Sequence, residues 1–215
     1  AERFNTIQRG LVGADRVFKI LDDDQTLPDN GKIKLEHVKG KIDFENVKFS
    51  YVPNNLVLKG ISFSTKPGEK VAIVGATGAG KSTIINLLSR FYDIDSGTIK
   101  IDDVNIYDMD LKNLRQHVAV VLQDVFLFNT TIFDNIVLGN KNITLNEVQN
   151  AAKIIGIDSF IMSLPKGYYS EVSERGATLS VGQRQLISFL RAYIYNPEIL
   201  VLDEATSSID TLSEE

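Results

Sequence analysis

The chain has 215 residues, of which 43% are hydrophobic and 24% are charged, and its formal net charge is −5. This composition is typical of a soluble globular protein with one sizeable domain and at most a small extra lobe. The negative charge argues against nucleic acid as a main partner, because proteins bind nucleic acid largely by neutralising its phosphates. The absence of cysteine excludes disulfides and fits a cytosolic compartment. No apolar run is long enough to predict a membrane-spanning helix.

An amphipathic segment opens the chain. Its apolar residues recur at alternating spacings of 3 and 4, at Phe4, Ile7, Leu11, Ala14, Phe18 and Leu21. This period predicts a helix with one apolar face. Gly10 and Gly13 weaken an isolated helix, so we expect this helix to lie on a surface. Polar residues follow over 22–31 and are typical of a solvated linker.

The rest of the chain alternates between strand and helix patterns. A strand with an irregularity near Glu45 and Asn46 is predicted from Lys41 onward. Further strands are predicted over 57–65, 98–101 and 118–122, a turn over 66–69, helical structure over 126–177, a helix over 181–195 and a fully buried strand over 199–202. Strands followed by mixed elements, a helical insertion and a last strand predict a two-lobed α/β domain.

A phosphate-binding pattern, G-x-x-x-x-G-K-[ST], lies between the apolar run 71–74 and helical spacing over 82–92. We expect a buried strand, a turn and a helix, so that the N–H groups of the turn and the helix N-terminus point at one spot. Lys81 adds a full charge for the β- and γ-phosphates, and the Ser82 hydroxyl is placed to hold Mg²⁺. The predicted nucleotide-binding residues of this loop are Gly75, Ala76, Thr77, Gly78, Ala79, Gly80, Lys81, Ser82 and Thr83.

Two acidic residues, Asp203 and Glu204, follow the apolar run 199–202. Carboxylates at the end of a parallel strand lie at the sheet edge where ligands bind in α/β proteins. We therefore expect Asp203 to hold Mg²⁺ through its water shell and Glu204 to lie near an attacking water.

The segment Leu179-Ser180-Val181-Gly182-Gln183 precedes this acidic pair by about twenty positions. Ser180 is a good N-cap for a helix that begins at Val181. Together with the phosphate loop and the acidic pair, this segment resembles the L-S-G-G-Q signature of ATP-binding-cassette (ABC) transporters. Val181 departs from the glycine usual there. The resemblance implies a phosphate-loop NTPase core with a mixed sheet, an N-terminal antiparallel β subdomain and an inserted α-helical subdomain.

The family resemblance implies roles for further residues. Tyr51 matches the aromatic ring that stacks on adenine, and Gln123 matches the glutamine that contacts Mg²⁺ and the attacking water. The resemblance therefore assigns Glu204, Gln123 and Lys81 to catalysis and Ser82, Gln123 and Asp203 to Mg²⁺. It also implies a head-to-tail dimer in which the signature contacts ATP bound to the second domain, through Ser180, Val181, Gly182 and Gln183. Asp210 matches the acidic member of the loop that crosses this interface, the D-loop.

The N-terminal helix and Glu174-Arg175-Gly176 are typical of the exporter type. The resemblance then implies an amphipathic helix and linker over 1–36, following a transmembrane domain, and a nucleotide-binding domain over 37–215 with a helical subdomain at about 125–190. We expect both ends to be cut from a longer protein. The family's γ-phosphate-contacting histidine lies well beyond Glu204, and neither His37 nor His117 can replace it, so we expect reduced activity from this chain.

The function implied by the resemblance is ATP binding and hydrolysis that powers export, with ATP and Mg²⁺ as cofactors. The implied partners are a second nucleotide-binding domain, identical or different, and the transmembrane domain of the same transporter, which places the domain at the cytoplasmic face of the membrane. A low-activity ATP-binding half of a heterodimeric exporter is an alternative, and an ABC ATPase outside transport is a weaker one. A GTPase is disfavoured, because Asn140-Lys141-Asn142-Ile143 lacks the aspartate that reads guanine.

Overall fold

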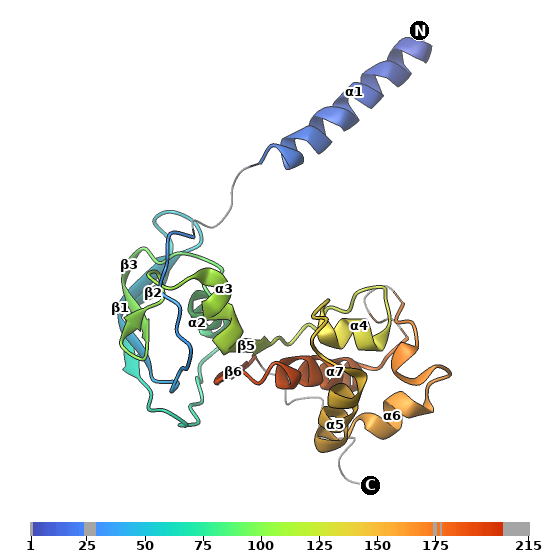
Figure 1. Ribbon diagram of the computed structural model, residues 1–215. Helices are drawn as coiled ribbons and strands as arrows, with labels where there is room; N and C mark the ends of the chain where they lie inside the picture. The colour runs from blue at the N-terminus through green and yellow to red at the C-terminus, as the bar shows by residue number, and fades with distance from the viewer. Residues whose placement is uncertain (1, 24–28, 174–175, 177, 204–215) are drawn as a thin grey trace.

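A computed structural model describes residues 2–23, 29–173, 176 and 178–203 of the chain. Two lobes follow a separate N-terminal helix in the ribbon view (Figure 1). The elements in chain order are α1 (Glu2–Leu21), β1 (Ile42–Ser50), β2 (Leu56–Ser64), α2 (Lys81–Leu88), β3 (Ser96–Ile101), β4 (Val104–Asn105), α3 (Leu111–His117), β5 (Val118–Val121), α4 (Ile132–Val137), α5 (Leu145–Ile155), α6 (Asp158–Ser163), the 3-10 helix η1 (Gly167–Tyr169), α7 (Val181–Ile194) and β6 (Ile199–Leu202).

The first lobe is built on a four-stranded antiparallel sheet in the order β2-β1-β3-β4. Its alternating apolar side chains form a core with α2, in which Phe44, Leu87 and Ile99 are almost completely buried. The predicted irregularity in β1 is confirmed, because the pairing with β2 shifts register between Phe44 and Val47 and Asn46 has a φ of 49°. This lobe carries the phosphate loop at the start of α2.

The second lobe consists of α4, α5, α6, η1 and α7 around a separate apolar core. Local sequence fixes where these helices begin. Thr131 caps α4, Thr144 forms a capping box with Glu147 at the start of α5, and Ser180 forms one with Gln183 at the start of α7. The pKa of Glu147 is lowered because its carboxylate accepts the Thr144 backbone and side-chain hydrogen bonds.

The parallel strands β5 and β6 pair along their whole length, from Val118 opposite Ile199 to Val121 opposite Leu202. Two predictions about this region were wrong. The run Val71–Val74 forms no strand, and the Val74 side chain is 87% exposed. β6 is not fully buried, since Leu200 and Leu202 are 47% and 41% exposed. The physical reason is shared: an apolar run predicts burial, but strand formation also requires a partner edge, and no described strand pairs with 71–74 or with the second edge of β6.

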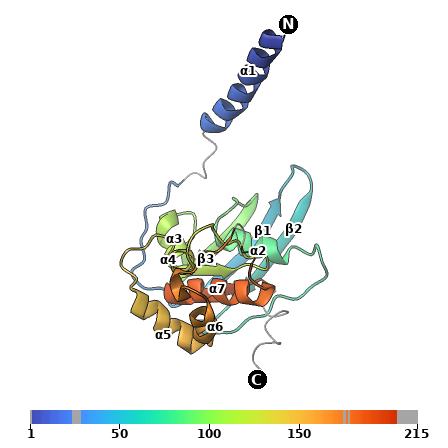
Figure 2. The same ribbon diagram turned by 90° about the vertical axis from the view of Figure 1, so that its right-hand side faces the viewer.

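The predicted N-terminal helix is present as α1, and it projects away from both lobes in the rotated view (Figure 2). Its apolar face is exposed: the side chains of Phe4, Leu11 and Phe18 have exposed fractions of 60% or more. The described residues therefore do not supply the surface on which we expected this helix to lie. No helix within the described ranges combines the length and apolar character needed to cross a membrane.

Candidate nucleotide-binding site

The phosphate loop leads directly into α2. Gly80 occupies the N-cap position with a φ of 91°, and Gly78 also has a positive φ, of 81°. L-amino acids with side chains rarely adopt these values, so glycine permits the sharp turn. The Lys81 ammonium donates to the carbonyl oxygens of Gly75 at 2.9 Å and Ala76 at 3.2 Å, which closes the loop. Residues 75–79 are exposed, so their backbone is accessible to a phosphate group.

α2 is shorter than the predicted helix over 82–92, because it ends at Leu88 and Arg90 adopts a left-handed φ of 50°. A side chain of α3 holds the C-terminal end of α2 in place. The Arg115 guanidinium donates to the carbonyl oxygens of Ser89 at 3.2 Å and Arg90 at 3.0 Å. Burial, and then the charge of Arg90, lowers the pKa of Arg115. A cation at this end of the helix also complements its dipole.

Ser82 and Asp203 meet at the junction of α2 and β6. The Ser82 hydroxyl donates to Asp203 Oδ1 at 3.4 Å, and the Asp203 backbone N–H donates to the Val121 carbonyl at 2.9 Å, which fixes the end of β6 beside β5. The structure thus brings together two predicted metal ligands that are distant in sequence. Their oxygens are hard ligands of the type Mg²⁺ prefers, so the residues present fit this ion. Gln123 lies exposed just beyond the end of β5.

The Tyr51 ring is held next to the phosphate-loop helix. Its hydroxyl lies 3.2 Å from Thr83 Oγ1 and accepts from Asn86 Nδ2 at 3.5 Å. Phe49 and Tyr92 contact the ring in edge-on geometry, with centroid distances of 4.7 and 5.0 Å. The Tyr51 side chain is still 46% exposed, so an oriented aromatic surface is available for a base.

Replacement of Tyr51 by alanine is expected to weaken ATP binding by roughly 1–3 kcal/mol, because stacking of a base on an aromatic ring contributes about this much. Isothermal titration calorimetry with ATP measures the loss, and Tyr51→Phe, which keeps the ring and removes the hydroxyl, is the control. Equal ATP affinities for the wild-type and Tyr51→Ala chains would contradict base stacking at this position.

The signature segment forms the start of α7. Ser180 Oγ accepts from the Gln183 backbone N–H at 3.1 Å, and Gln183 Oε1 accepts from the Ser180 N–H at 2.9 Å. The predicted N-cap is therefore confirmed. Gly182 is buried, whereas Val181, which departs from the family pattern, is 51% exposed. A β-branched side chain at this position is accommodated at the surface of this chain.

The predicted site residues Glu204 and Asp210, together with Glu174 and Arg175, lie outside the described residues.

Two positions that the sequence patterns did not predict, Asn135 and Arg191, hold the segment after Gln123. Asn135 is completely buried and pairs with Phe128, donating to its carbonyl at 3.0 Å and accepting from its N–H at 2.8 Å. Arg191 Nε donates to the Asn135 carbonyl at 2.8 Å. The sequence signal for Asn135 was a pair of polar residues, Asp134 and Asn135, within the otherwise apolar helix Ile132–Val137.

Comparison with known proteins places this geometry in a family. The profile described as "ABC transporter" matches residues 58–207. The chain is 44% identical over 214 residues to a fatty acid ABC transporter ATP-binding/permease protein of Mycobacterium bovis, covering 100% of this chain and 34% of that protein. It is 47% identical over 208 residues to an ATP-dependent lipid A-core flippase of Saccharophagus degradans, covering 97% of this chain and 35% of the flippase.

A solved structure of a bacterial Atm1-family ABC exporter with ATP bound is also similar. It superposes with a TM-score of 0.85 at 41% identity, covering 97% of this chain and 36% of the exporter chain. The predicted fold is thereby confirmed: a phosphate-loop NTPase core with an antiparallel β subdomain and a helical insertion. This chain spans about a third of the length of the relatives it matches. The phosphate loop, the capped signature helix and these similarities together show that the chain belongs to the ABC transporter family.

Proposed function

We propose that this chain is the ATP-binding and ATP-hydrolysing motor domain of an ABC exporter. The contact between Ser82 and Asp203 carries the proposal, because it joins the phosphate loop to the strand end that precedes Glu204. A phosphate-binding turn and a metal-binding carboxylate at one point are the requirements of nucleotide hydrolysis. The similarity to ATP-binding/permease proteins supports the same assignment.

Each site residue has a proposed role. Lys81 binds the β- and γ-phosphates with the backbone of the loop, and Tyr51 stacks on adenine. Ser82, Gln123 and Asp203 would hold Mg²⁺, which when bound neutralises developing phosphate charge. Glu204, next to Asp203 in the chain, orients the attacking water and accepts its proton.

The proposed organisation assigns residues 1–36 to a helix and linker that follow a transmembrane domain, and 37–215 to the nucleotide-binding domain. A permease segment in the relatives supports a transmembrane partner and a position at the cytoplasmic face of the membrane. The exposed apolar face of α1 is consistent with such a partner.

The proposed cycle requires a second nucleotide-binding domain, with which this domain forms a dimer. Ser180, Gly182 and Gln183 at the start of α7 contact ATP bound to the partner domain, with Asp210 at the interface. A helix N-terminus suits this role because its orphan N–H groups and dipole attract the γ-phosphate. ATP binding then closes the dimer and hydrolysis reopens it.

The Glu204→Gln chain, which keeps ATP bound, is expected to change from monomer to dimer when MgATP is added, as measured by light scattering. The double variant Glu204→Gln/Ser180→Arg is the matched control, because a bulky charge at the signature should prevent closure while the phosphate loop still binds ATP. Tight ATP binding without a dimer would contradict self-association of this chain and favour a requirement for the transmembrane domain, for further parts of the protein or for a different partner half.

A further inference from the structure

Residues 29–41, between α1 and β1, form a segment that we call the strap, and its first part is bonded to the loop before α3. The N–H groups of Lys32 and Ile33 both donate to the Asp108 carbonyl at 2.9 Å, and the Asp110 N–H donates back to Ile33 at 2.9 Å. Bonds in both directions hold this part of the strap flat against the nucleotide lobe. The chain just after the predicted polar linker is thus anchored to the nucleotide lobe by backbone hydrogen bonds.

Gly31 shows how close this approach is. A Cβ at position 31 would overlap the carbonyl group of Met109, which belongs to the same loop. Only glycine, which lacks that atom, permits backbone contact at this distance. The sequence of the strap is therefore matched to the surface under it.

The centre of the strap is clamped at Leu35. The Leu35 N–H donates to Asn113 Oδ1 at 2.8 Å, and Asn113 Nδ2 donates to the Leu35 carbonyl at 3.1 Å. His117 Nε2 lies 2.9 Å from the same carbonyl oxygen, and His117 Nδ1 lies 2.8 Å from Glu198 Oε2. The His117 residue is only 7% exposed, so it bridges the strap to Glu198 within the protein.

The bridge between His117 and Glu198 lies at the start of the two strands whose ends lead to proposed site residues. His117 immediately precedes β5 and Glu198 immediately precedes β6. The two strands are short and fully paired, so their starting points are rigidly connected to their ends. Those ends lead to Gln123 and Asp203. His117 thus contacts the strap at one end of the strand pair, and proposed Mg²⁺ ligands lie at the other.

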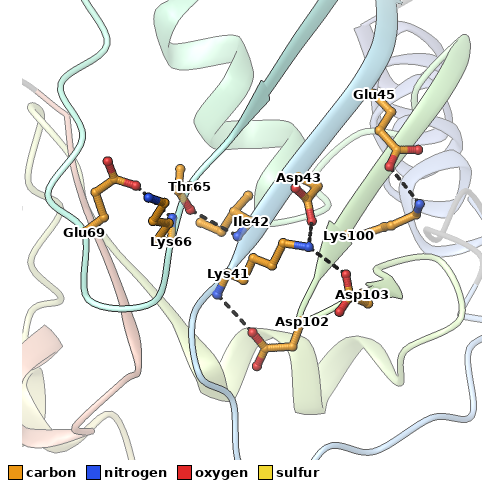
Figure 3. Close-up of polar contacts among 10 residues, drawn as sticks. All are labelled: Lys41, Ile42, Asp43, Glu45, Thr65, Lys66, Glu69, Lys100, Asp102 and Asp103. Carbon is orange, nitrogen blue, oxygen red and sulfur yellow. Dashed lines mark hydrogen bonds and ion pairs between the residues drawn. The ribbon is translucent and has the colours of Figure 1, made fainter.

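The far end of the strap is fixed to the turn between β3 and β4 (Figure 3). The backbone N–H groups of Lys39 and Lys41 both donate to the Asp102 carboxylate. The Lys41 ammonium lies 2.7 Å from Asp103 and 3.0 Å from Asp43. Hydrogen bonds to these two carboxylates raise the pKa of Lys41. With both ends and the centre bonded, the strap cannot slide without moving its contacts.

We propose that His117 is a positioning residue that ties the strap to strands β5 and β6 and thereby fixes where Gln123 and Asp203 lie. The proposal rests on the proposed function, since those residues matter only if the site takes MgATP. Its physical basis is that the buried His117 contacts both Leu35 and Glu198 directly, at 2.9 and 2.8 Å. Loss of the link would leave the phosphate loop, with Ser82, intact and misplace Gln123 and Asp203.

The test measures the affinity of the 215-residue chain for ATP by calorimetry, once with Mg²⁺ and once with EDTA. In His117→Ala we expect ATP affinity in EDTA to stay unchanged and the strengthening by Mg²⁺ to fall about tenfold, the usual effect of losing a residue that orients metal ligands. His37, the second of the two histidines, is exposed within the same strap, so His37→Ala is the matched control and should behave as wild type. Partial recovery in His117→Gln would support hydrogen bonding as the cause.

An unchanged Mg²⁺ effect in folded His117→Ala overturns the inference and leaves the proposed function in place. Failure of the wild-type chain to bind ATP overturns both. If His117→Ala does not fold, the wild-type chain decides, because its two imidazole signals can be followed by NMR during titration with MgATP. A shift of the His117 signal alone supports the link, and an unmoved His117 signal overturns it.

Discussion

Replacing Lys81 by alanine is expected to weaken MgATP binding by on the order of 100-fold, equivalent to about 3 kcal/mol, because a charge paired with phosphate is removed. In the structure the Lys81 ammonium donates to the carbonyl oxygens of Gly75 and Ala76, at the point where the loop is open to solvent. A bound triphosphate would replace these neutral acceptors with charged ones, which form stronger hydrogen bonds. Calorimetry with MgATP measures the change in Kd.

Lys70→Ala is the matched control for this experiment. Lys70 is an exposed lysine ahead of the same loop, so its removal changes the net charge equally without touching the phosphate site. We expect its Kd for MgATP to stay within about threefold of wild type, since exposed charges are screened. Equal affinity of Lys81→Ala and wild type would reject the phosphate-loop assignment, whatever the control shows.

Asn135→Leu is expected to lower the free energy of unfolding of the helical lobe by about 3 kcal/mol, because three hydrogen bonds to backbone groups are lost at about 1 kcal/mol each. The Asn135 amide bonds to both the N–H and the carbonyl of Phe128, and also donates to the Thr131 carbonyl at 3.0 Å. Leucine has a similar volume, so the loss is chiefly of hydrogen bonds. Urea denaturation followed by circular dichroism measures the change.

Asn150, an exposed asparagine on α5 of the same lobe, provides the comparison. Asn150→Leu should alter stability by no more than about 0.5 kcal/mol, as is usual for surface positions. A loss in Asn135→Leu no larger than in Asn150→Leu would show that the bonds to Phe128 do not stabilise the lobe. The same bonds hold the segment that follows Gln123, so a destabilised lobe is also expected to loosen that side of the site.

The features predicted correctly from sequence depend on neighbouring residues. The turn of the phosphate loop follows from Gly78 and Gly80, whose positive φ angles glycine favours. The start of α7 follows from Ser180 and Gln183, which cap each other three positions apart. Short-range chemistry of this type can be read from sequence because no distant partner is required.

The features that sequence analysis missed depend on distant partners. The run Val71–Val74 is apolar, but no neighbouring strand pairs with it among the described residues, and composition carries no information about pairing. Only residues 29–31 of the strap belong to the predicted solvated linker 22–31, and the order of the strap comes from distant contacts such as those of Lys32 and Ile33 with the Asp108 carbonyl. Likewise, the role of His117 requires Glu198, which is far away in sequence.

The strap also sets the order in which the domain can fold. Leu35 bonds to Asn113 across 78 residues, and His117 contacts Glu198 across a further 81. Contacts between residues so far apart close long loops, which slows their formation relative to local hairpins and helices. During synthesis the strap can bond to Asp108 and Asn113 once these residues have left the ribosome, whereas the contact of His117 with Glu198 forms only after 81 further residues have been made.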